Sequence, residues 1–168
     1  MNIYKTIKEL GRNAKAVTQS MRLLSTKKKN GALRILSKNI QTFSNEILDA
    51  NKKDIENAKT NSLSSPLINR LSLTPQSIEG LVKSIEIIKT LPDPIGKILD
   101  EWTQPNGLKF QKISVPLGVI AVIYESRPNV TVDAACIAMK SGNAVILRGG
   151  SDSFFSSKKL VEIIINSF

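Results

Sequence analysis

The stretch from Val115 to Ser151, VPLGVIAVIYESRPNVTVDAACIAMKSGNAVILRGGS, decides the fold of this chain. Its segment Val119 to Tyr124 is apolar on both faces, which predicts a strand buried on both sides of a parallel sheet. A helix from Asn129 to Lys140 and a second apolar strand from Asn143 to Leu147 follow. Strand, crossover helix and strand form a right-handed βαβ unit, the beginning of a doubly wound α/β sheet.

The helix of this segment and the helix that follows it carry specific expectations. The helix from Asn129 is expected to end at Gly142 as a C-terminal cap, and its expected inward-facing residues are Val130, Ala134, Ile137 and Ala138. Asp152 or Ser153 is expected to cap a last helix. The apolar residues of that last helix are Leu160, Ile163 and Ile164.

The residues before Val115 predict helices and then a hairpin. One apolar stripe recurs at spacings of three and four, at Leu33, Leu36, Ile40, Phe43 and Ile47. The stripe slips near Asp49, so Asn51 is expected to cap a continuing helix. Ser65-Pro66 and Thr74-Pro75 open two further helices. The pair Asn106-Gly107 predicts a hairpin between two strands, Lys97 to Thr103 and Leu108 to Val115.

These patterns divide the chain into three parts. Residues 1–95 form a helical N-terminal part, 96–115 a β-hairpin, and 116–168 a βαβα dinucleotide-binding unit. Two parallel strands are too few to complete such a sheet, and the apolar last helix has too few partners. The sequence therefore predicts the front part of a larger Rossmann-like domain.

Composition restricts the possible chemistry. The chain has 168 residues, of which 41% are hydrophobic and 23% charged, which is typical of a soluble globular domain. No apolar run is long enough for a membrane helix, and we expect a cytoplasmic protein that does not bind membranes. With no histidine, the sequence excludes Ser-His-Asp and Cys-His mechanisms and histidine-based metal sites, and we expect no metal.

The net charge of +10 allows two interpretations. Aromatic residues make up only 5% and the lysines are dispersed, which favours a solvated basic surface and no nucleic-acid partner. The alternative is a non-enzymatic module whose basic helical half binds RNA or a partner protein.

Two polar loops follow the two strands, where open α/β sheets bind ligands. Arg148-Gly149-Gly150-Ser151 runs into a helix N-terminus and could bind phosphate, or its glycines could simply form a tight turn. In the other loop, Asn129 could cap its helix, or Arg127 and Asn129 could contact a substrate. Glu125 could be a general acid or base, or a surface carboxylate.

The single cysteine, Cys136, lies in the middle of a predicted helix. Because no histidine can activate it and no loop exposes it, we interpret it as a buried packing thiol and identify no catalytic residue. Asp133, three residues earlier, is expected to face solvent.

Four segments, RLSLTPQSIEGL, LPDPIGKILDEW, VPLGVIAVIYESRPNVTVDAA and KSGNAVILRGGS, closely resemble the gamma-glutamyl phosphate reductase family, also called glutamate-5-semialdehyde dehydrogenase. The family belongs to the aldehyde dehydrogenase superfamily. The resemblance extends from about residue 28 to the last residues. It implies an enzyme that uses NADPH to reduce gamma-glutamyl phosphate to glutamate 5-semialdehyde in proline biosynthesis. The motif ESRPNVT argues against another branch of the superfamily.

The resemblance also implies roles for both loops. Arg148, Gly149, Gly150 and Ser151 correspond to the loop that binds the adenosine end of NADP(H), and a serine at position 151 leaves room for a 2′-phosphate. The loop with Arg127 and Asn129 corresponds to the segment that approaches the reacting carbonyl, although the Pro-Trp-Asn usual in the superfamily is absent.

The family's catalytic cysteine lies in a segment beyond Phe168. We therefore expect a truncated reductase that is inactive alone, binds NADP(H) weakly or not at all, and acts only if a second chain supplies the remainder. The edges of the hairpin are a candidate contact for a homo-oligomer.

Overall fold

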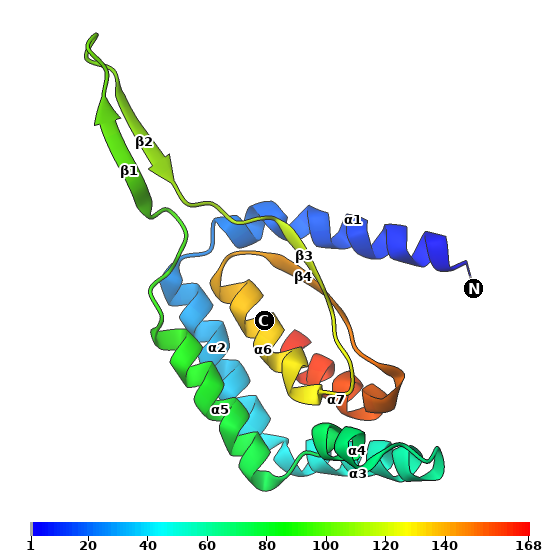
Figure 1. The fold of residues 1–168 in the computed structure, drawn as a ribbon. Coiled ribbons are helices and arrows are strands. Elements are labelled where there is room, and N and C mark those ends of the chain that lie inside the picture. Colours follow the sequence, from blue (N-terminus) through cyan, green and yellow to red (C-terminus); the bar gives the residue numbers. More distant parts are fainter. Residues whose placement is uncertain (1) are drawn as a thin grey trace.

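The computed structural model describes residues 2–168 and has three consecutive parts (Figure 1). The helical part consists of α1 (Ile3–Arg22), α2 (Thr26–Thr42), α3 (Ser44–Thr60), α4 (Ser65–Leu71) and α5 (Pro75–Thr90). The hairpin consists of β1 (Ile98–Thr103) and β2 (Lys109–Ile113). The last part consists of β3 (Val119–Ile123), α6 (Pro128–Lys140), β4 (Ala144–Arg148), the 3₁₀ helix η1 (Ser151–Ser153) and α7 (Phe154–Ile165).

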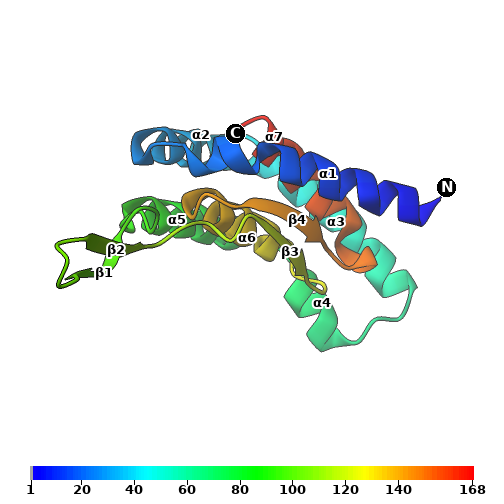
Figure 2. The ribbon, with the colours of Figure 1, turned by 90° about the horizontal axis from the view of Figure 1, so that it is seen from above.

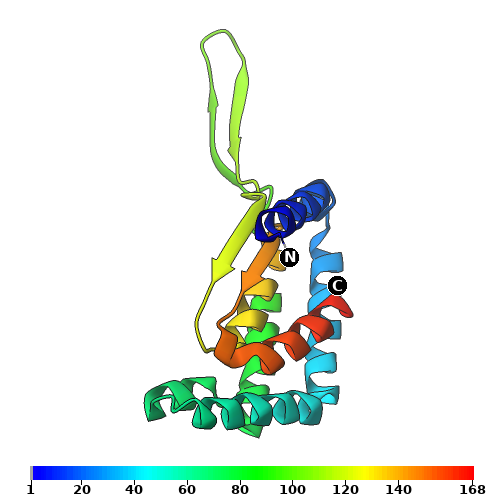
Figure 3. The ribbon, with the colours of Figure 1, turned by 90° about the vertical axis from the view of Figure 1, so that its right-hand side faces the viewer.

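The βαβ unit predicted from the sequence is confirmed. β3 and β4 pair in parallel, in a register that runs from Val119 opposite Ala144 to Ile123 opposite Arg148. α6 connects them, and Gly142 ends the connection with a φ of +68°, a conformation that glycine adopts without steric cost. The same register makes both strands end at one edge of the sheet, which Figure 3 shows from the side.

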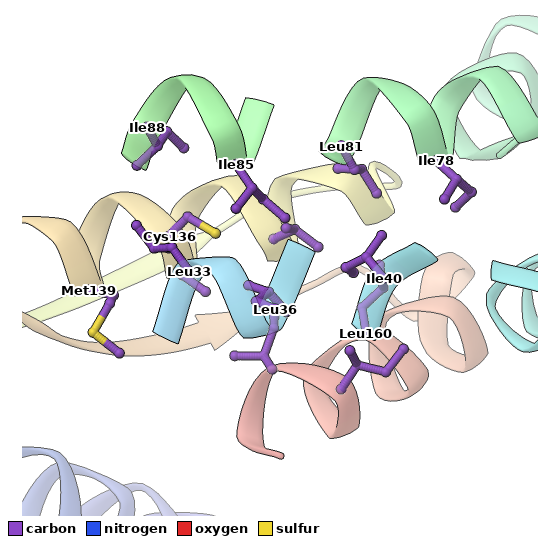
Figure 4. Packing of buried hydrophobic residues seen from close by; sticks show 14 of the residues in the cluster. Leu33, Leu36, Ile40, Ile78, Leu81, Ile85, Ile88, Cys136, Met139 and Leu160 are labelled. Atoms are coloured by element: carbon purple, nitrogen blue, oxygen red, sulfur yellow. The ribbon is translucent and has the colours of Figure 1, made fainter. Parts of the chain in front are cut away.

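The core lies where α2, α5, α6 and α7 pack together (Figure 4). The apolar stripes of these helices supply it, because i, i+3 and i+4 positions share one face of a helix. Its buried residues are Leu33, Leu36, Ile40, Ile47, Ile78, Leu81, Ile85, Ile88, Val132, Ala135, Cys136, Met139, Leu160, Ile163 and Ile164.

The predicted helix break at Asn51 is wrong. The chain breaks at Phe43, between α2 and α3, and Asn51 lies within α3. The Asn51 side chain caps nothing in its own helix, because it donates to the Leu71 carbonyl and the Ser156 hydroxyl and accepts from the Leu73 amide. Asn51 thus joins α3 to the end of α4, to the segment after it and to α7.

The burial expected for α6 is found only in part, and that expected for β3 is wrong. In α6, Ala138 is buried as expected, but Ile137 is 56% exposed. The other buried hydrophobic residues are Val132, Ala135, Cys136 and Met139, because α5, α7 and β4 pack around the helix and leave its Ile137 side open. In β3, exposure alternates and Ile123 is 82% exposed. α6 lies against one face of the sheet, and residues 2–168 leave alternate β3 side chains uncovered on the other.

The hairpin, with its predicted Asn106-Gly107 turn, is confirmed and projects away from the helices, at the end of the molecule opposite α3 and α4 (Figures 1 and 2). Every residue of β1 and β2 is exposed. Trp102 and Phe110 lie opposite each other in the register, with their rings stacked at a centroid distance of 5.5 Å. This aromatic pair packs within the hairpin, apart from the core.

None of the helices described between Asn2 and Phe168 is long and apolar enough to cross a membrane.

Buried charges join the helices at the base of the hairpin. Lys29, only 1% exposed, forms an ion pair of 3.0 Å with Asp93, which also accepts from the Thr26 hydroxyl and the Ile95 amide. Lys140, also buried, donates to the Asn30 side chain at 2.7 Å and to the Lys89 carbonyl at 3.0 Å. Each buried ammonium is therefore hydrogen-bonded, as burial of a charge requires.

We expect Asp93→Asn to destabilise the chain in a pH-dependent manner. Burial alone raises the pKa of the Asp93 carboxyl, but hydrogen bonds from the Ile95 amide, Lys29 and Thr26 outweigh it and lower the pKa. A lowered pKa stabilises the fold at neutral pH, and this contribution disappears as the pH falls through the folded-state pKa. The difference in unfolding free energy between the parent chain and Asp93→Asn should therefore be largest at neutral pH and become smaller below about pH 4.

Urea unfolding of the parent chain and of Asp93→Asn, from neutral pH to below about pH 4, measures this difference in stability. The matched control is Asp49→Asn, which removes a carboxylate from the exposed pair with Lys52 and should change stability little. A difference that stays constant down to acid pH would contradict the role of the Asp93 charge.

Candidate functional site

The candidate site lies at the edge of the sheet where β3 and β4 end. Because Ile123 is opposite Arg148, the two loops predicted as functional leave the sheet side by side. The Tyr124 amide donates to the Arg148 carbonyl at 3.0 Å, and the Ser126 hydroxyl donates to the Asp152 carboxylate at 2.9 Å. The two loops are thus joined into one polar surface.

The two glycines allow close packing between these loops. A Cβ added at Gly149 would lie 3.2 Å from the Tyr124 ring, and one at Gly150 would lie 3.5 Å from the Glu125 backbone. The Tyr124 hydroxyl is held at 2.6 Å from the Thr131 hydroxyl, so its ring cannot move away freely. The close approach of the Tyr124 ring is therefore sufficient to explain a glycine at position 149, without a ligand.

The other two residues of the predicted cofactor loop point to solvent. Arg148 is exposed, and its guanidinium donates to the Gly149 carbonyl. Ser151 begins η1 and is exposed as well. Both side chains are therefore available to a ligand that lies beyond the end of β4.

The N-terminus of α7 is filled by the chain's own carboxylate. Asp54 of α3, 1% exposed, accepts from the amides of Phe155 at 3.0 Å and Ser156 at 2.7 Å and from the Ser156 hydroxyl. Ser153, one of the two expected caps, occupies the N-cap position of α7, but its side chain makes no capping hydrogen bond. A helix N-terminus favours an anion, and at the start of α7 that anion is the Asp54 carboxylate.

Arg127 and Asn129 lie in different places. α6 begins at Pro128 with Arg127 as its N-cap residue and no side-chain cap, so the expected cap by Asn129 is wrong. Arg127 lines a cavity of about 250 Å³ at the end of β3, which we call the strand-end cavity. Asn129 lines a second cavity of about 290 Å³ among α4, α5 and α6, which we call the helix cavity.

Arg70 lines both cavities, and sequence reasoning missed it. It lies in the last turn of α4, where a basic residue is readily explained by the helix dipole. The only available signal was its place in the quoted segment RLSLTPQSIEGL.

The carboxylates near these cavities differ in their surroundings. Glu125 is exposed and lines the strand-end cavity. Asp133 does not simply face solvent as expected. It is half-buried, lines the helix cavity, and accepts a hydrogen bond of 2.9 Å from the Ser84 hydroxyl.

The interpretation of Cys136 as a packing thiol is confirmed. The residue is fully buried in the core. Burial, and to a smaller extent the Asp133 carboxylate, raises the pKa of Cys136 to about 12. A thiol in this state provides no nucleophile at neutral pH.

Comparison with known proteins confirms the resemblance. No family model matches the chain. The chain is 48% identical to the gamma-glutamyl phosphate reductase of Histophilus somni over 158 residues, which is 94% of this chain and 38% of that protein. It is 42% identical to that of Desulforapulum autotrophicum over 167 residues, 99% of this chain and 40% of the relative. The chain thus spans about two fifths of the curated relatives it matches.

Solved structures agree. The gamma-glutamyl phosphate reductase of Thermotoga maritima superposes with a TM-score of 0.92 at 36% identity, over 95% of this chain and 38% of that one. A putative aldehyde dehydrogenase of Bacillus subtilis, 14% identical, superposes with a TM-score of 0.71 over 97% of this chain and 34% of its own, which shows the shared fold. The chain is therefore homologous, over nearly its whole length, to the N-terminal part of gamma-glutamyl phosphate reductases.

We expect Asp54→Asn to lower the free energy of unfolding by about 2–4 kcal/mol, because it removes a buried charge that accepts three hydrogen bonds at the start of α7. Thermal or urea unfolding measures the loss. Glu56→Gln on the exposed side of the same helix is the matched control and should change stability by less than about 0.5 kcal/mol. Equal stability of the two variants would show that Asp54 does not hold α7.

Proposed function

We propose that this chain is the N-terminal part of an NADPH-dependent gamma-glutamyl phosphate reductase, which forms glutamate 5-semialdehyde and phosphate in proline biosynthesis. The similarity to enzymes of that name over nearly the whole chain carries the proposal. A cytoplasmic location is part of the same proposal, as is assembly with identical chains or with a second chain that supplies the remainder.

We assign the adenosine end of NADP(H) to Arg148, Gly149, Gly150 and Ser151. Two observations support a 2′-phosphate there: the Arg148 and Ser151 side chains are exposed at the end of β4, and position 151 carries no carboxylate that would repel it. The start of α7 does not suit the pyrophosphate, since Asp54 already accepts from its amides. When bound, the cofactor supplies the hydride for the reduction.

The substrate is assigned to the neighbouring loop, at Arg127 and Asn129. Arg127 brings a positive charge to the strand-end cavity, where an acyl phosphate has a charge to neutralise. The single cysteine of this sequence, Cys136, is buried in the core and cannot attack an acyl phosphate. In this proposal the nucleophile therefore belongs to the portion of the relatives that this chain does not span.

A chimera tests the function. This chain replaces the corresponding part of the Histophilus somni relative, and the product is assayed for phosphate-dependent oxidation of glutamate 5-semialdehyde with NADP⁺. We expect turnover by the chimera and none by the 168-residue chain alone. A folded chimera without turnover would overturn the proposed function, and robust turnover by the chain alone would refute our assignment of the nucleophile.

The cofactor assignment has a separate test on the chain itself. We expect Arg148→Ala to weaken NADPH binding about tenfold, equivalent to about 1.4 kcal/mol, through loss of a charge-assisted contact. Lys158→Ala removes the same charge from an exposed position of α7 and serves as control. Ser151→Glu should weaken binding of NADPH but not NADH, since only the former carries the 2′-phosphate. Titration calorimetry distinguishes these cases, and unchanged NADPH affinity in both variants would place the cofactor elsewhere.

A further inference from the structure

The strand-end cavity and the helix cavity share one wall, Arg70. Arg127 adds a second guanidinium on the strand-end side, and Asp133 and Asn129 line the helix cavity on the other side. Within residues 2–168, neither Arg70 nor Arg127 has a carboxylate within ion-pair distance. Two guanidinium groups beside these neighbouring cavities are therefore free to bind an anionic ligand.

The helix cavity presents both signs of charge at once. Arg70 offers the planar donor group that matches a carboxylate in two parallel hydrogen bonds. Asp133 keeps one carboxylate oxygen on the Ser84 hydroxyl at 2.9 Å, which fixes its orientation and leaves the other oxygen as an acceptor. The Asn129 amide makes no hydrogen bond to another described residue and can contribute a donor or an acceptor. Groups of both signs thus line one cavity, as a ligand that carries a carboxylate and an ammonium requires.

We propose that the helix cavity binds the α-amino acid head group of the substrate, with Arg70 on its α-carboxylate and Asp133 on its α-ammonium. The inference rests on the proposed function, because glutamyl substrates carry that head group. The remainder of the substrate then extends past Arg70 toward Arg127 and the end of β3, where the reacting carbonyl is expected. Arg70 and Asp133 thereby determine that the substrate is an amino acid rather than a simple aldehyde.

Gly80 provides an independent way to block this cavity. It lines the helix cavity on α5, and a Cβ added there would meet no atom within 4 Å. A side chain added at position 80 therefore begins in open space at the lining of this cavity. Because leucine also favours a helix more than glycine, Gly80→Leu should preserve the fold while closing the cavity.

The experiment titrates the 168-residue chain with L-glutamate, glutarate or γ-aminobutyrate and follows backbone amide shifts by NMR. L-Glutamate carries both head-group charges, glutarate lacks the ammonium, and γ-aminobutyrate lacks the α-carboxylate. We expect L-glutamate to bind with a dissociation constant of about 1 mM and to shift the amide signals around Asp133. Both analogues should bind about tenfold more weakly or worse, because each leaves one charged group of the site unpaired.

The variants identify the residues. Arg70→Gln, Asp133→Asn and Gly80→Leu should each weaken L-glutamate binding about tenfold or more, whereas Arg12→Gln on the exposed side of α1 should not. The dispersion of each amide spectrum verifies folding. Absence of L-glutamate binding by the parent chain, equal binding of glutarate, or full binding by Arg70→Gln together with Gly80→Leu would each overturn the inference.

Failure of this inference can be distinguished from failure of the proposed function. In the chimera, Arg70→Gln should raise KM for glutamate 5-semialdehyde about tenfold with little change in kcat, because it removes binding of a remote group. Turnover with an unchanged KM would retain the reductase function and refute the head-group site. An inactive chimera whose N-terminal part still binds L-glutamate through Arg70 would refute the function and retain the amino acid site.

Discussion

The Asp54 carboxylate is the interaction on which the position of the candidate site depends. It lies in α3 and is buried, yet it holds the first amides of α7, about a hundred residues later in the chain. Asn51, one helical turn earlier, binds Ser156 and the segment after α4. The two side chains thus set where α7 starts, and with it where η1 and the loop after β4 lie. A helix of the first part of the chain therefore positions the loop assigned to the cofactor.

This arrangement changes how the loop after β4 can meet a dinucleotide. In many α/β domains the free amides of the following helix receive a phosphate. Here an internal carboxylate takes that place, so attraction for a phosphate must come from side chains instead. Arg148 is the cation at this position, while Asp152 beside it is held by Ser126. Under the proposed assignment, affinity for a phosphorylated cofactor is therefore concentrated in very few groups, and the α7 terminus is complete without that cofactor.

Much of this fold could be predicted from sequence, because helix and strand periodicity depend on local residues. The Asn106-Gly107 turn and the βαβ order are local signals, and both are present. The predicted stripe supplies Leu33, Leu36, Ile40 and Ile47 to the core, but its member Phe43 is exposed at the break between α2 and α3. Asn51 shows where local reasoning fails: the pattern predicts a cap of its own helix, whereas its partners are distant in sequence. Sequence reasoning also misses Arg70, because this residue matters through the cavities that it lines with α5, α6 and the loop after β3. Side chains that join distant segments leave no periodic pattern.

The stacked pair in the hairpin has a spectroscopic consequence. Trp102 is the single tryptophan of the chain, and it packs on Phe110 in a hairpin that projects from the helices. The core around α2, α5, α6 and α7 contains none. Tryptophan emission is therefore an optical label of the hairpin, whereas far-ultraviolet circular dichroism follows the helices. Divergence of the two signals during denaturation would reveal the hairpin melting as a separate unit, and coincidence would show that a strand pair outside the core still unfolds cooperatively with it.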